Sequence, residues 1–346
     1  MARRIRTQVK GNFSYLYLAI VGAATVFIAI VVANVNKTSD YQMKIIDFEN
    51  DIKEEIQRVS KDIGFKVSVD QHFHKILLDY LTVRTKIIEP KTRRILINPV
   101  FLQEIQRHPK KNEIEFIINY AKLGKNLNVF QSKKMLQSNF HDHLQNEWNI
   151  YHFHLSLVKD KKSDFVKQVN SLLFVYITND TIVFLGTDTH RDGIFGDVKW
   201  IEILHDNFPD LIKEYRDDKI LDIHPKVNSI ERQTIWNKGL SMGMTKVKGV
   251  VYHNPGIGRM TSGHSMTVSK TAMDLSRWIH KLKEQIELMK EELALYLKTT
   301  FDEIDFRIRF GEITLELVEM SSKTMLVEFP QILIDKEELK ERINGR

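Results

Sequence analysis

The segment Phe140–Val158 reads FHDHLQNEWNIYHFHLSLV and places histidines among alternating apolar residues. Such alternation is typical of a β-strand, whose successive side chains point to opposite faces of a sheet. It predicts that His152 and His154 share one face, while Tyr151 and Phe153 lie on the other. The segment therefore predicts a strand with one apolar face for the core and one face that carries two imidazoles.

Two further β-rich runs follow at 172–178 and 181–185, and Asn179-Asp180 separates them. Asn and Asp tolerate the left-handed backbone of a tight turn, so this dipeptide predicts a β-hairpin. A helical pattern at 200–208 then ends before Pro209. The central part of the chain is thus predicted to be a helix, a three-stranded antiparallel meander and another helix.

The whole chain is predicted to be an α+β protein, with an N-terminal transmembrane helix, small antiparallel sheets with flanking helices, and one long heptad-patterned helix. The segment 36–64 has apolar residues at helical spacing, which predicts either a stalk or the first packed helix. Changes of pattern divide the chain into five parts. These are a basic arm at 1–14, an apolar span at 15–35, the helix at 36–64, an α+β domain with the His-rich meander at 65–225, and a C-terminal part at 226–346 that holds a strand, a Gly-rich loop, a long helix and a β-meander.

The apolar span 15–35 is long enough to cross a bilayer, since a membrane helix needs roughly 20 such residues. Four basic residues and no acidic residue precede it. By the positive-inside rule, this arrangement predicts a single-pass protein of the cell membrane, with a cytoplasmic N-terminus and the C-terminal domain outside. A cleaved signal peptide is the alternative, because Val31 and Ala33 offer a small-residue cleavage pattern.

The segment 265–299 has apolar residues spaced alternately four and three apart, as in a heptad repeat. The seam consists of Val268, Ala272, Leu275, Ile279, Leu282, Ile286, Met289, Leu293 and Tyr296. Such a helix can form a homodimer through its seam or can pack along a face of its own chain. The spacing leaves both arrangements open.

The overall composition restricts the chemistry of the chain. There is no cysteine, which excludes disulfides, thiolate catalysis and cysteine-ligated zinc. The formal charge is +6, and because four positive charges precede the apolar span, about +2 remains for the rest of the chain. A nucleic-acid partner is therefore not favoured by net charge.

The strongest candidates for chemistry are His152, His154 and His190, with Arg191 beside the last of them. Imidazole transfers protons near neutral pH and also binds transition metals. The three histidines and Asp188 together could hold a divalent transition metal with one open position for water. Without a metal, His152, His154, His190 and Arg191 could form a catalytic site for acid–base chemistry.

The stretch NSLLFVYITNDTIVFLGTDTHRD, residues 170–192, resembles the RelE-like bacterial toxins. In that family, helices are followed by a small antiparallel sheet that ends in a basic pair, and the resemblance covers about 140–208. It implies an RNA-cleaving enzyme in which a 2′-hydroxyl attacks the phosphate. Strand histidines would then act as base and acid, while Arg191 and Lys133 or Lys134 would hold the phosphate. Histidines occupy the place of the Arg-rich central strand that is common in the family.

The loop 258–265, GRMTSGHS, has the glycine spacing of a phosphate-binding loop before a helix, but His264 stands where such a loop needs lysine. The free N–H groups of a helix N-terminus can still bind an anion, here around Gly258, Gly263 and Ser265. The alternative is a turn in which Ser262 or Ser265 caps the helix.

Two classes of function remain open from the sequence. The first is a membrane-anchored effector whose His-rich sheet is its active or binding face, as a hydrolase or nuclease if it is an enzyme. The second is a non-enzymatic interaction or oligomerisation module, in which sheet and seam serve packing and partner binding.

Overall fold

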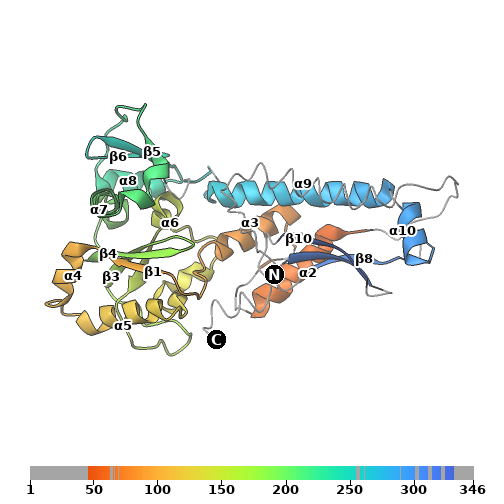
Figure 1. Ribbon diagram of the computed structural model, residues 1–346, viewed down its shortest axis with the longest axis horizontal. Coiled ribbons are helices and arrows are strands. Elements are labelled where there is room, and N and C mark those ends of the chain that lie inside the picture. Colours follow the sequence, from red (N-terminus) through yellow and green to blue (C-terminus); the bar gives the residue numbers. More distant parts are fainter. Residues whose placement is uncertain are drawn as a thin grey trace, which may run out of the picture. The chain divides into compact units, whose positions relative to one another are not determined.

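The computed structural model describes residues 46–62, 65, 67–68, 70–254, 258–260, 262–288, 290–300, 304–310, 314–320 and 324–330. The chain divides into two compact units, which Figure 1 shows coloured along the sequence. The described part of unit 1 consists of 46–52 and the residues from 278 to 330, and that of unit 2 lies between 53 and 277.

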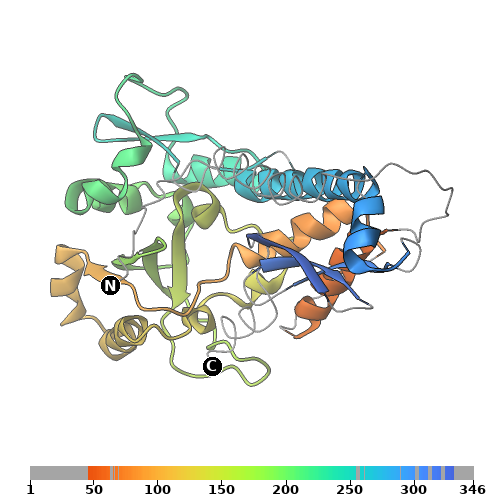
Figure 2. The same cartoon turned by 45° about the vertical axis from the view of Figure 1, so that its right-hand side comes forward.

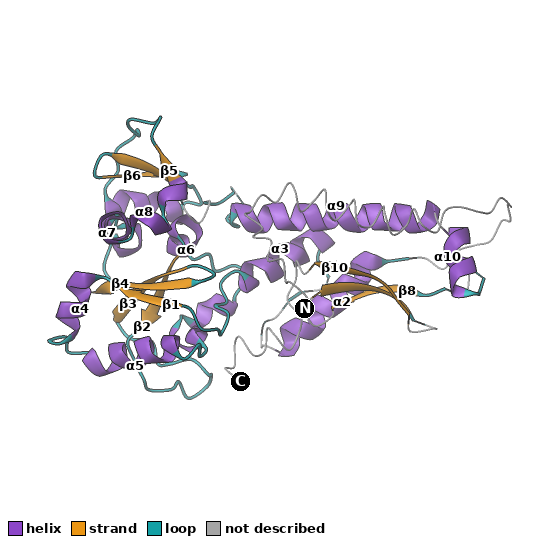
Figure 3. Ribbon diagram, viewed as in Figure 1, coloured by secondary structure: helices purple, strands orange, loops and turns teal. Residues whose placement is uncertain are grey.

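The centre of unit 2 is a four-stranded sheet in the order β1-β4-β3-β2 (Figure 3). Its strands are β1 (Arg94–Ile97), β2 (Ile150–His154), β3 (Ser171–Ile177) and β4 (Thr181–Thr189). The strands β2, β3 and β4 pair antiparallel in succession, so the predicted meander and its hairpin are confirmed. The strand β1 adds to the edge of β4 in parallel.

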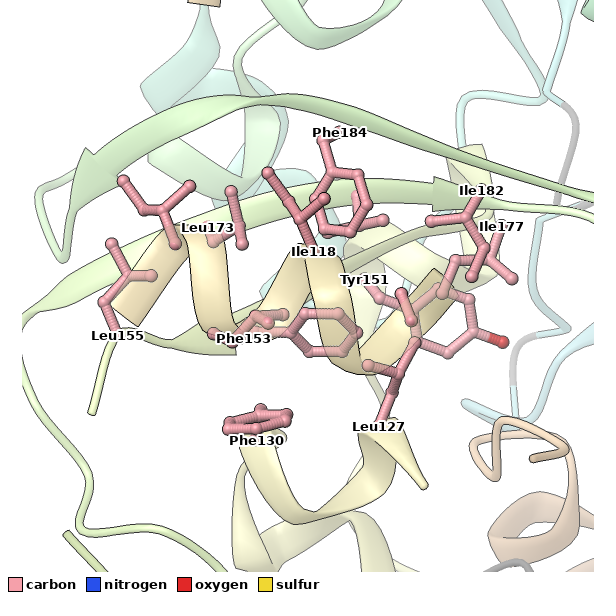
Figure 4. Packing of buried hydrophobic residues seen from close by; sticks show 14 of the residues in the cluster. Ile118, Leu127, Phe130, Tyr151, Phe153, Leu155, Leu173, Ile177, Ile182 and Phe184 are labelled. Atoms are coloured by element: carbon pink, nitrogen blue, oxygen red, sulfur yellow. The ribbon is translucent and has the colours of Figure 1, made fainter. Parts of the chain in front are cut away.

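One face of this sheet packs against α5 (Lys111–Lys122), whose apolar residues Ile114, Ile117, Ile118 and Ala121 follow the helical repeat and are all buried. Figure 4 shows the side chains of this cluster, among them Tyr151, Phe153 and Leu155 of β2 and its extension. The predicted apolar face of β2 is therefore confirmed. Each large side chain buried here stabilises the fold by about 1.5–3 kcal/mol.

The opposite face of the sheet packs against α6 (His143–Trp148), α7 (Lys199–Asn207) and α8 (Ser229–Asn237). Three fully buried tryptophans fill this side, and the ring of Trp200 stacks on Phe174 of β3 at 4.0 Å between centroids. Figures 1 and 2 both show the sheet between α5 on one side and the helices α6 to α8 on the other. Covering both faces explains why the strands are apolar almost throughout.

Several further elements lie wholly within unit 2. They are α3 (Phe73–Arg84), α4 (Pro99–Ile105), the 3₁₀ turns at Leu127–Phe130, Lys133–Leu136, Ile194–Gly196, Pro209–Leu211 and Lys213–Tyr215, and a small sheet in the order β5-β7-β6, made of β5 (Arg216–Asp217), β6 (Met244–Val247) and β7 (Val250–His253). The sequence predicts a single strand over 247–253, whereas the structure has a turn at Lys248-Gly249 that separates the end of β6 from β7. The two-residue strand β5 is not predicted.

Unit 1 contains a three-stranded antiparallel sheet, β10-β9-β8, made of β8 (Phe306–Phe310), β9 (Thr314–Glu319) and β10 (Thr324–Pro330). The predicted C-terminal meander is thereby confirmed. The helix α2 (Phe48–Asp62) begins in this unit, and its buried Asp51 accepts hydrogen bonds from the backbone N–H of Ile308 at 3.0 Å and from Arg307 Nη1 at 2.8 Å. The carboxylate of Asp51 thus links the first turns of α2 to β8 by two hydrogen bonds.

The predicted long helix at 265–299 is found as α9 (Met266–Leu288) and α10 (Lys290–Leu297). Six seam residues of α9, Val268, Ala272, Leu275, Ile279, Leu282 and Ile286, are each at most 7% exposed. Because the chain itself already covers these side chains, the structure favours packing within the chain. The predicted homodimer through this helix stays a prediction.

The predicted transmembrane span, 15–35, lies outside the residues that the structure describes. Among the helices that are described, none is both long and apolar enough to cross a bilayer; even α9, the longest, carries charged residues along its length. The predictions of a transmembrane helix in the fold and of a single-pass protein of the cell membrane, with a cytoplasmic N-terminus and the C-terminal domain outside, are corrected accordingly. The α+β class with small sheets and several helices stands.

Candidate functional site

Unit 2 contains a cavity of about 340 Å³ on the sheet face that carries the histidines. Five imidazoles line it, those of His141, His143, His152, His154 and His190. Asp142, Lys134, Phe195, Gln233 and Asn237 are among its other lining residues. We call this cavity the histidine pocket.

The sheet brings three of the five imidazoles together. His152 and His154 are two residues apart on β2, so their rings lie on the same face, with centroids 6.3 Å apart. His190 follows directly after β4, where its N–H donates to the backbone carbonyl of Asn170 at 3.1 Å. Its ring centroid lies 5.7 Å from that of His154 and 6.4 Å from that of His152. These are the three histidines that the sequence singles out.

The segment before α6 supplies the other two imidazoles and a carboxylate. Asp142 is the N-cap of α6, and its Oδ1 accepts a hydrogen bond from the N–H of Gln145 at 3.1 Å. Its second oxygen, Oδ2, lies 3.5 Å from Nδ1 of His152. That separation fits an ion pair with a protonated imidazole better than a hydrogen bond. One carboxylate therefore starts a helix and faces a pocket histidine.

Buried polar atoms of the pocket have unused hydrogen-bonding capacity. The Nδ1 atoms of His141, His143 and His152 are shielded from solvent and have no hydrogen-bond partner within the described part of the chain. Leaving a buried polar atom unpaired costs about 1–3 kcal/mol. Three residues of the pocket thus each retain one imidazole nitrogen that the described part of the chain leaves unpaired.

Burial sets the charge of most of these rings. It lowers the pKa of His141, His143 and His154 to about 4 each, and it also lowers the pKa of His190. The positive charge of nearby Arg259 adds to this effect at His141 and His143. At neutral pH these imidazoles are uncharged, so each has one nitrogen that can accept a proton.

The hydrogen bonding of His154 indicates which nitrogen that is. Its Nδ1 lies 2.9 Å from the carbonyl oxygen of Val169 and 3.3 Å from the N–H of the same residue. Only one of these contacts can be a hydrogen bond at a time, and the shorter one requires the proton on Nδ1. In that tautomer, Nε2 of His154 carries the free lone pair.

The structure does not bring Asp188 and Arg191 into the histidine pocket, because neither residue lines it. Arg191 instead donates to Asp188 at 3.1 Å and to Asp197 at 2.8 Å, and Lys199 also pairs with Asp188. Within the described part, no group of three or more His, Asp or Glu side chains is arranged to hold a metal ion. The predicted four-ligand metal set is thus divided between three histidines in the pocket and an aspartate in an ion-pair cluster.

The glycine-rich loop, residues 258–265, uses its polar groups for hydrogen bonds within the chain. The N–H groups of Gly258 and Gly263 already donate to the carbonyls of Asn146 and Met260, both at 2.9 Å, so neither is available to an anion. Ser265 Oγ accepts from the N–H of Val268 at 3.1 Å and so caps α9. These bonds favour the capping role over the predicted anion site.

The same loop contacts His141 directly. Gly263 has a φ of +87°, and a Cβ at this position would lie 3.2 Å from Nε2 of His141. His264 packs edge-on against His141 with centroids 5.2 Å apart, and its Nδ1 is 2.8 Å from Thr82 Oγ1. The left-handed backbone and the missing side chain therefore allow the loop to approach this pocket histidine closely.

Sequence reasoning marks some further residues of the pocket and misses others. His141 and His143 stand two apart in the sequence, as His152 and His154 do, whereas the capping role of Asp142 emerges only with α6. Gln233 and Asn237 come from α8, far along the chain, and no local pattern marks them.

The fold and the pocket define an α+β protein with a histidine-lined site on a mixed sheet. No protein-family model, no curated protein and no solved structure matches the chain.

Proposed function

We propose that the histidine pocket is an active site that cleaves an RNA phosphodiester by metal-free acid–base catalysis. The observation that carries this proposal is the convergence of five imidazoles, one carboxylate and one lysine on a single cavity of about 340 Å³. Cavities of this size hold ligands as large as a nucleotide. Proton transfer by positioned side chains contributes typically 10²–10⁴-fold to a rate.

The reaction assigns a role to each group. His154 takes the proton of a 2′-hydroxyl on its free Nε2, and the 2′-oxygen then attacks the adjacent phosphorus. The bond from phosphorus to the 5′-oxygen breaks, and His152 donates a proton to that oxygen. The products are a cyclic 2′,3′-phosphate and a free 5′-hydroxyl.

The surroundings of the three groups allow these roles. Burial lowers the pKa of His154 to about 4, so the ring is uncharged at neutral pH and its Nε2 is free to accept a proton, and the same shift makes it a weaker base. The carboxylate of Asp142, 3.5 Å from His152, attracts a positively charged imidazole. Lys134 is exposed at the pocket and makes no ion pair with any residue that the structure describes, which leaves its ammonium available for phosphate oxygens.

The order of elements also supports the proposal. The helices α4, α5 and α6 precede an antiparallel run of three strands, and His190-Arg191 follows its last strand. This is the arrangement that the resemblance to RelE-like toxins implies. Of the basic residues predicted to hold the phosphate, Lys134 lines the pocket, whereas Arg191 is paired with Asp188 and Asp197.

The test is cleavage of an end-labelled oligoribonucleotide by the purified full-length protein in the presence of EDTA. We expect cleavage that ends in a cyclic phosphate, and a loss of about 10²-fold or more in rate for His152→Ala and for His154→Ala. His280→Ala, which removes an imidazole that is 77% exposed, is the matched control and should cleave normally. An oligomer with 2′-deoxyribose at every position should remain intact.

Thermal unfolding of each variant separates loss of catalysis from loss of fold. Absence of cleavage by the wild-type protein would overturn the proposal. Cleavage that EDTA abolishes and a divalent transition metal restores would replace it with metal-assisted hydrolysis. Unfolded His152→Ala and His154→Ala variants would instead assign the histidines to the core.

A further inference from the structure

Unit 2 contains a second cavity, of about 310 Å³, on another side of α8. Asp222, Lys226, Arg232, Thr245 and Lys246 supply its polar lining. We call it the basic cavity. It shares no lining residue with the histidine pocket.

The charges of the basic cavity do not balance. Lys246 Nζ lies 2.9 Å from Oδ1 of Asp222, and Lys226 Nζ lies 3.5 Å from its Oδ2. Arg232 contributes a third positive charge to the lining, and the carboxylates of Asp197 and Glu147, which do not line the cavity, also lie near its guanidinium. The residues that line the cavity thus carry an excess of two positive charges, which favours an anionic ligand.

Arg232 is the innermost of these cations. It is only 6% exposed, and its Nη1 donates to the carbonyl of Gly196 at 2.9 Å. Its Nε is buried and has no hydrogen-bond partner within the described part of the chain. The guanidinium also lies over the ring of Trp148, 5.6 Å from the ring centroid. Phosphate is a suitable ligand for its other N–H groups, since guanidinium and phosphate form paired hydrogen bonds.

The helix α8 connects the two cavities. Arg232 lines the basic cavity, and the next residue, Gln233, lines the histidine pocket. Successive helix residues project about 100° apart around the axis, so the cavities flank the same turn of α8. A helix with its side chains is about 10–12 Å across. A single nucleic-acid strand that passes this turn can therefore reach both cavities.

We propose that the basic cavity binds a phosphate of the same RNA strand that the histidine pocket cleaves. The proposal rests on the proposed function, and it adds that the substrate is a strand of several nucleotides rather than a dinucleotide. Lys226, Lys246 and Arg232 hold a backbone phosphate that is remote from the cleaved bond. Because they contact no base, this subsite recognises a strand without reading its sequence.

Binding tests the subsite independently of cleavage. The probe is a fluorescent single-stranded octamer of 2′-deoxynucleotides, which has the phosphates but cannot be cleaved by this route. We expect Lys226→Ala together with Lys246→Ala to weaken binding at least tenfold, and to reduce the slope of log affinity against log salt by about 1 for each lost contact. Asp222→Asn keeps the size of the side chain, removes the one negative charge and should tighten binding.

The matched control is Lys159→Ala together with Lys213→Ala, which removes the same charge from lysines that are 68% and 72% exposed and line neither cavity. It should bind as the wild type does. Equal weakening by both double variants would overturn the subsite, because the effect would then be one of net charge. An unchanged affinity in the Lys226/Lys246 variant would overturn it as well.

Substrate length separates this inference from the proposed function. The Lys226/Lys246 variant should cleave a dinucleotide at the wild-type rate and an octamer at least tenfold more slowly at low concentration. If His152→Ala abolishes cleavage while the lysine variant cleaves both substrates normally, the active site stands and the second subsite fails. If the octamer binds through the lysines but no RNA is cleaved, the proposed function fails and binding of a strand at the basic cavity stands.

Discussion

At the scale of single residues, Asp142 has a structural role and a proposed chemical role in the pocket. Its Oδ1 caps α6 through the N–H of Gln145, and its Oδ2 faces Nδ1 of His152. Asparagine caps helices about as well as aspartate does, but it carries no charge. The two roles of Asp142 can therefore be separated by a single substitution.

We expect Asp142→Asn to keep the stability of the wild type and to lower the cleavage rate by about 10²-fold. Without the carboxylate, the imidazole of His152 loses the acidic neighbour that lies 3.5 Å from its Nδ1. Thermal unfolding and the rate of cleavage are the measurements, with Asp142→Ala as a comparison that also removes the cap. If Asp142→Asn left the rate unchanged while Asp142→Ala lowered it together with the melting temperature, Asp142 would act only through the position of α6.

Lys86 supports the same segment from the interior. It is 3% exposed, and its Nζ donates to the carbonyls of Gln137 and Phe140, both at 2.7 Å. Burial lowers its pKa from 10.5 to about 7, while the negative charge of Asp142 acts in the opposite direction. The buried amine thus fixes the backbone of the segment that precedes His141.

This pKa predicts a stability that rises with pH. Between pH 7 and 10.5 the folded chain binds fewer protons at Lys86 than the unfolded chain does, so the free energy of unfolding increases across that window. In Lys86→Met this increase is absent, and the variant loses more stability relative to wild type at pH 9 than at pH 7. Urea unfolding at both pH values measures it, with the exposed Lys238→Met as control. Parallel pH dependence in wild type and Lys86→Met would contradict the assignment.

At this scale the sequence predicts part of the site and misses the rest. The two-residue spacing of His152 and His154 is enough to place both rings on one face, because a strand alternates its sides. Placing His190 beside them required only the hairpin. The ion pairs of Asp188 with Arg191 and Lys199 could not be predicted, since they depend on where the 3₁₀ turn Ile194–Gly196 and α7 turn back toward the sheet. Charge partners of this kind are set by tertiary packing.

At the scale of elements, the strongest local signals agree with the structure. Two local signals are enough to predict the Asn179-Asp180 turn, the strand β2 and the C-terminal strands. They are the residue types of the turn and the two-residue alternation of apolar and polar side chains along a strand. The strands β5 and β6 were missed because strands of only two and four residues are stabilised by their neighbours rather than by a sequence pattern of their own. The parallel pairing of β1 with β4 could not be predicted, because the two strands lie more than eighty residues apart in the sequence.

The seam of α9 provides a prediction at the same scale. Leu275 is fully buried, whereas Met273, on another face of the helix, is 40% exposed. We expect Leu275→Ala to lower the free energy of unfolding by about 2–5 kcal/mol and Met273→Ala to change it by less than about 0.5 kcal/mol. Denaturant unfolding measures both, and sedimentation should give the same oligomeric state for both variants. If Leu275→Ala instead dissociated a stable dimer while the monomer kept its stability, the seam would be an intermolecular interface.

At the scale of the whole molecule, both units are assembled from segments that are far apart in the sequence. In unit 1, the buried Asp51 near the start of the described chain bonds to residues 307 and 308 of β8. Unit 2 has its own core on both faces of the four-stranded sheet. The predicted boundaries at 64 and 225 follow local composition, whereas the structural division follows long-range contacts at 52 and 277. Local composition holds no information about such pairing.

Because each unit has its own set of contacts, we expect heating to unfold them in two separable transitions, as is common for chains of more than one domain. Leu173→Ala, at a fully buried position of β3, should lower one transition by several degrees through the cavity it leaves. Asp51→Ala should lower the other, because it leaves the N–H of Ile308 without its acceptor, at a cost of about 1–3 kcal/mol. Scanning calorimetry of the full chain measures both variants. A single transition that both substitutions lower together would show that the units unfold as one.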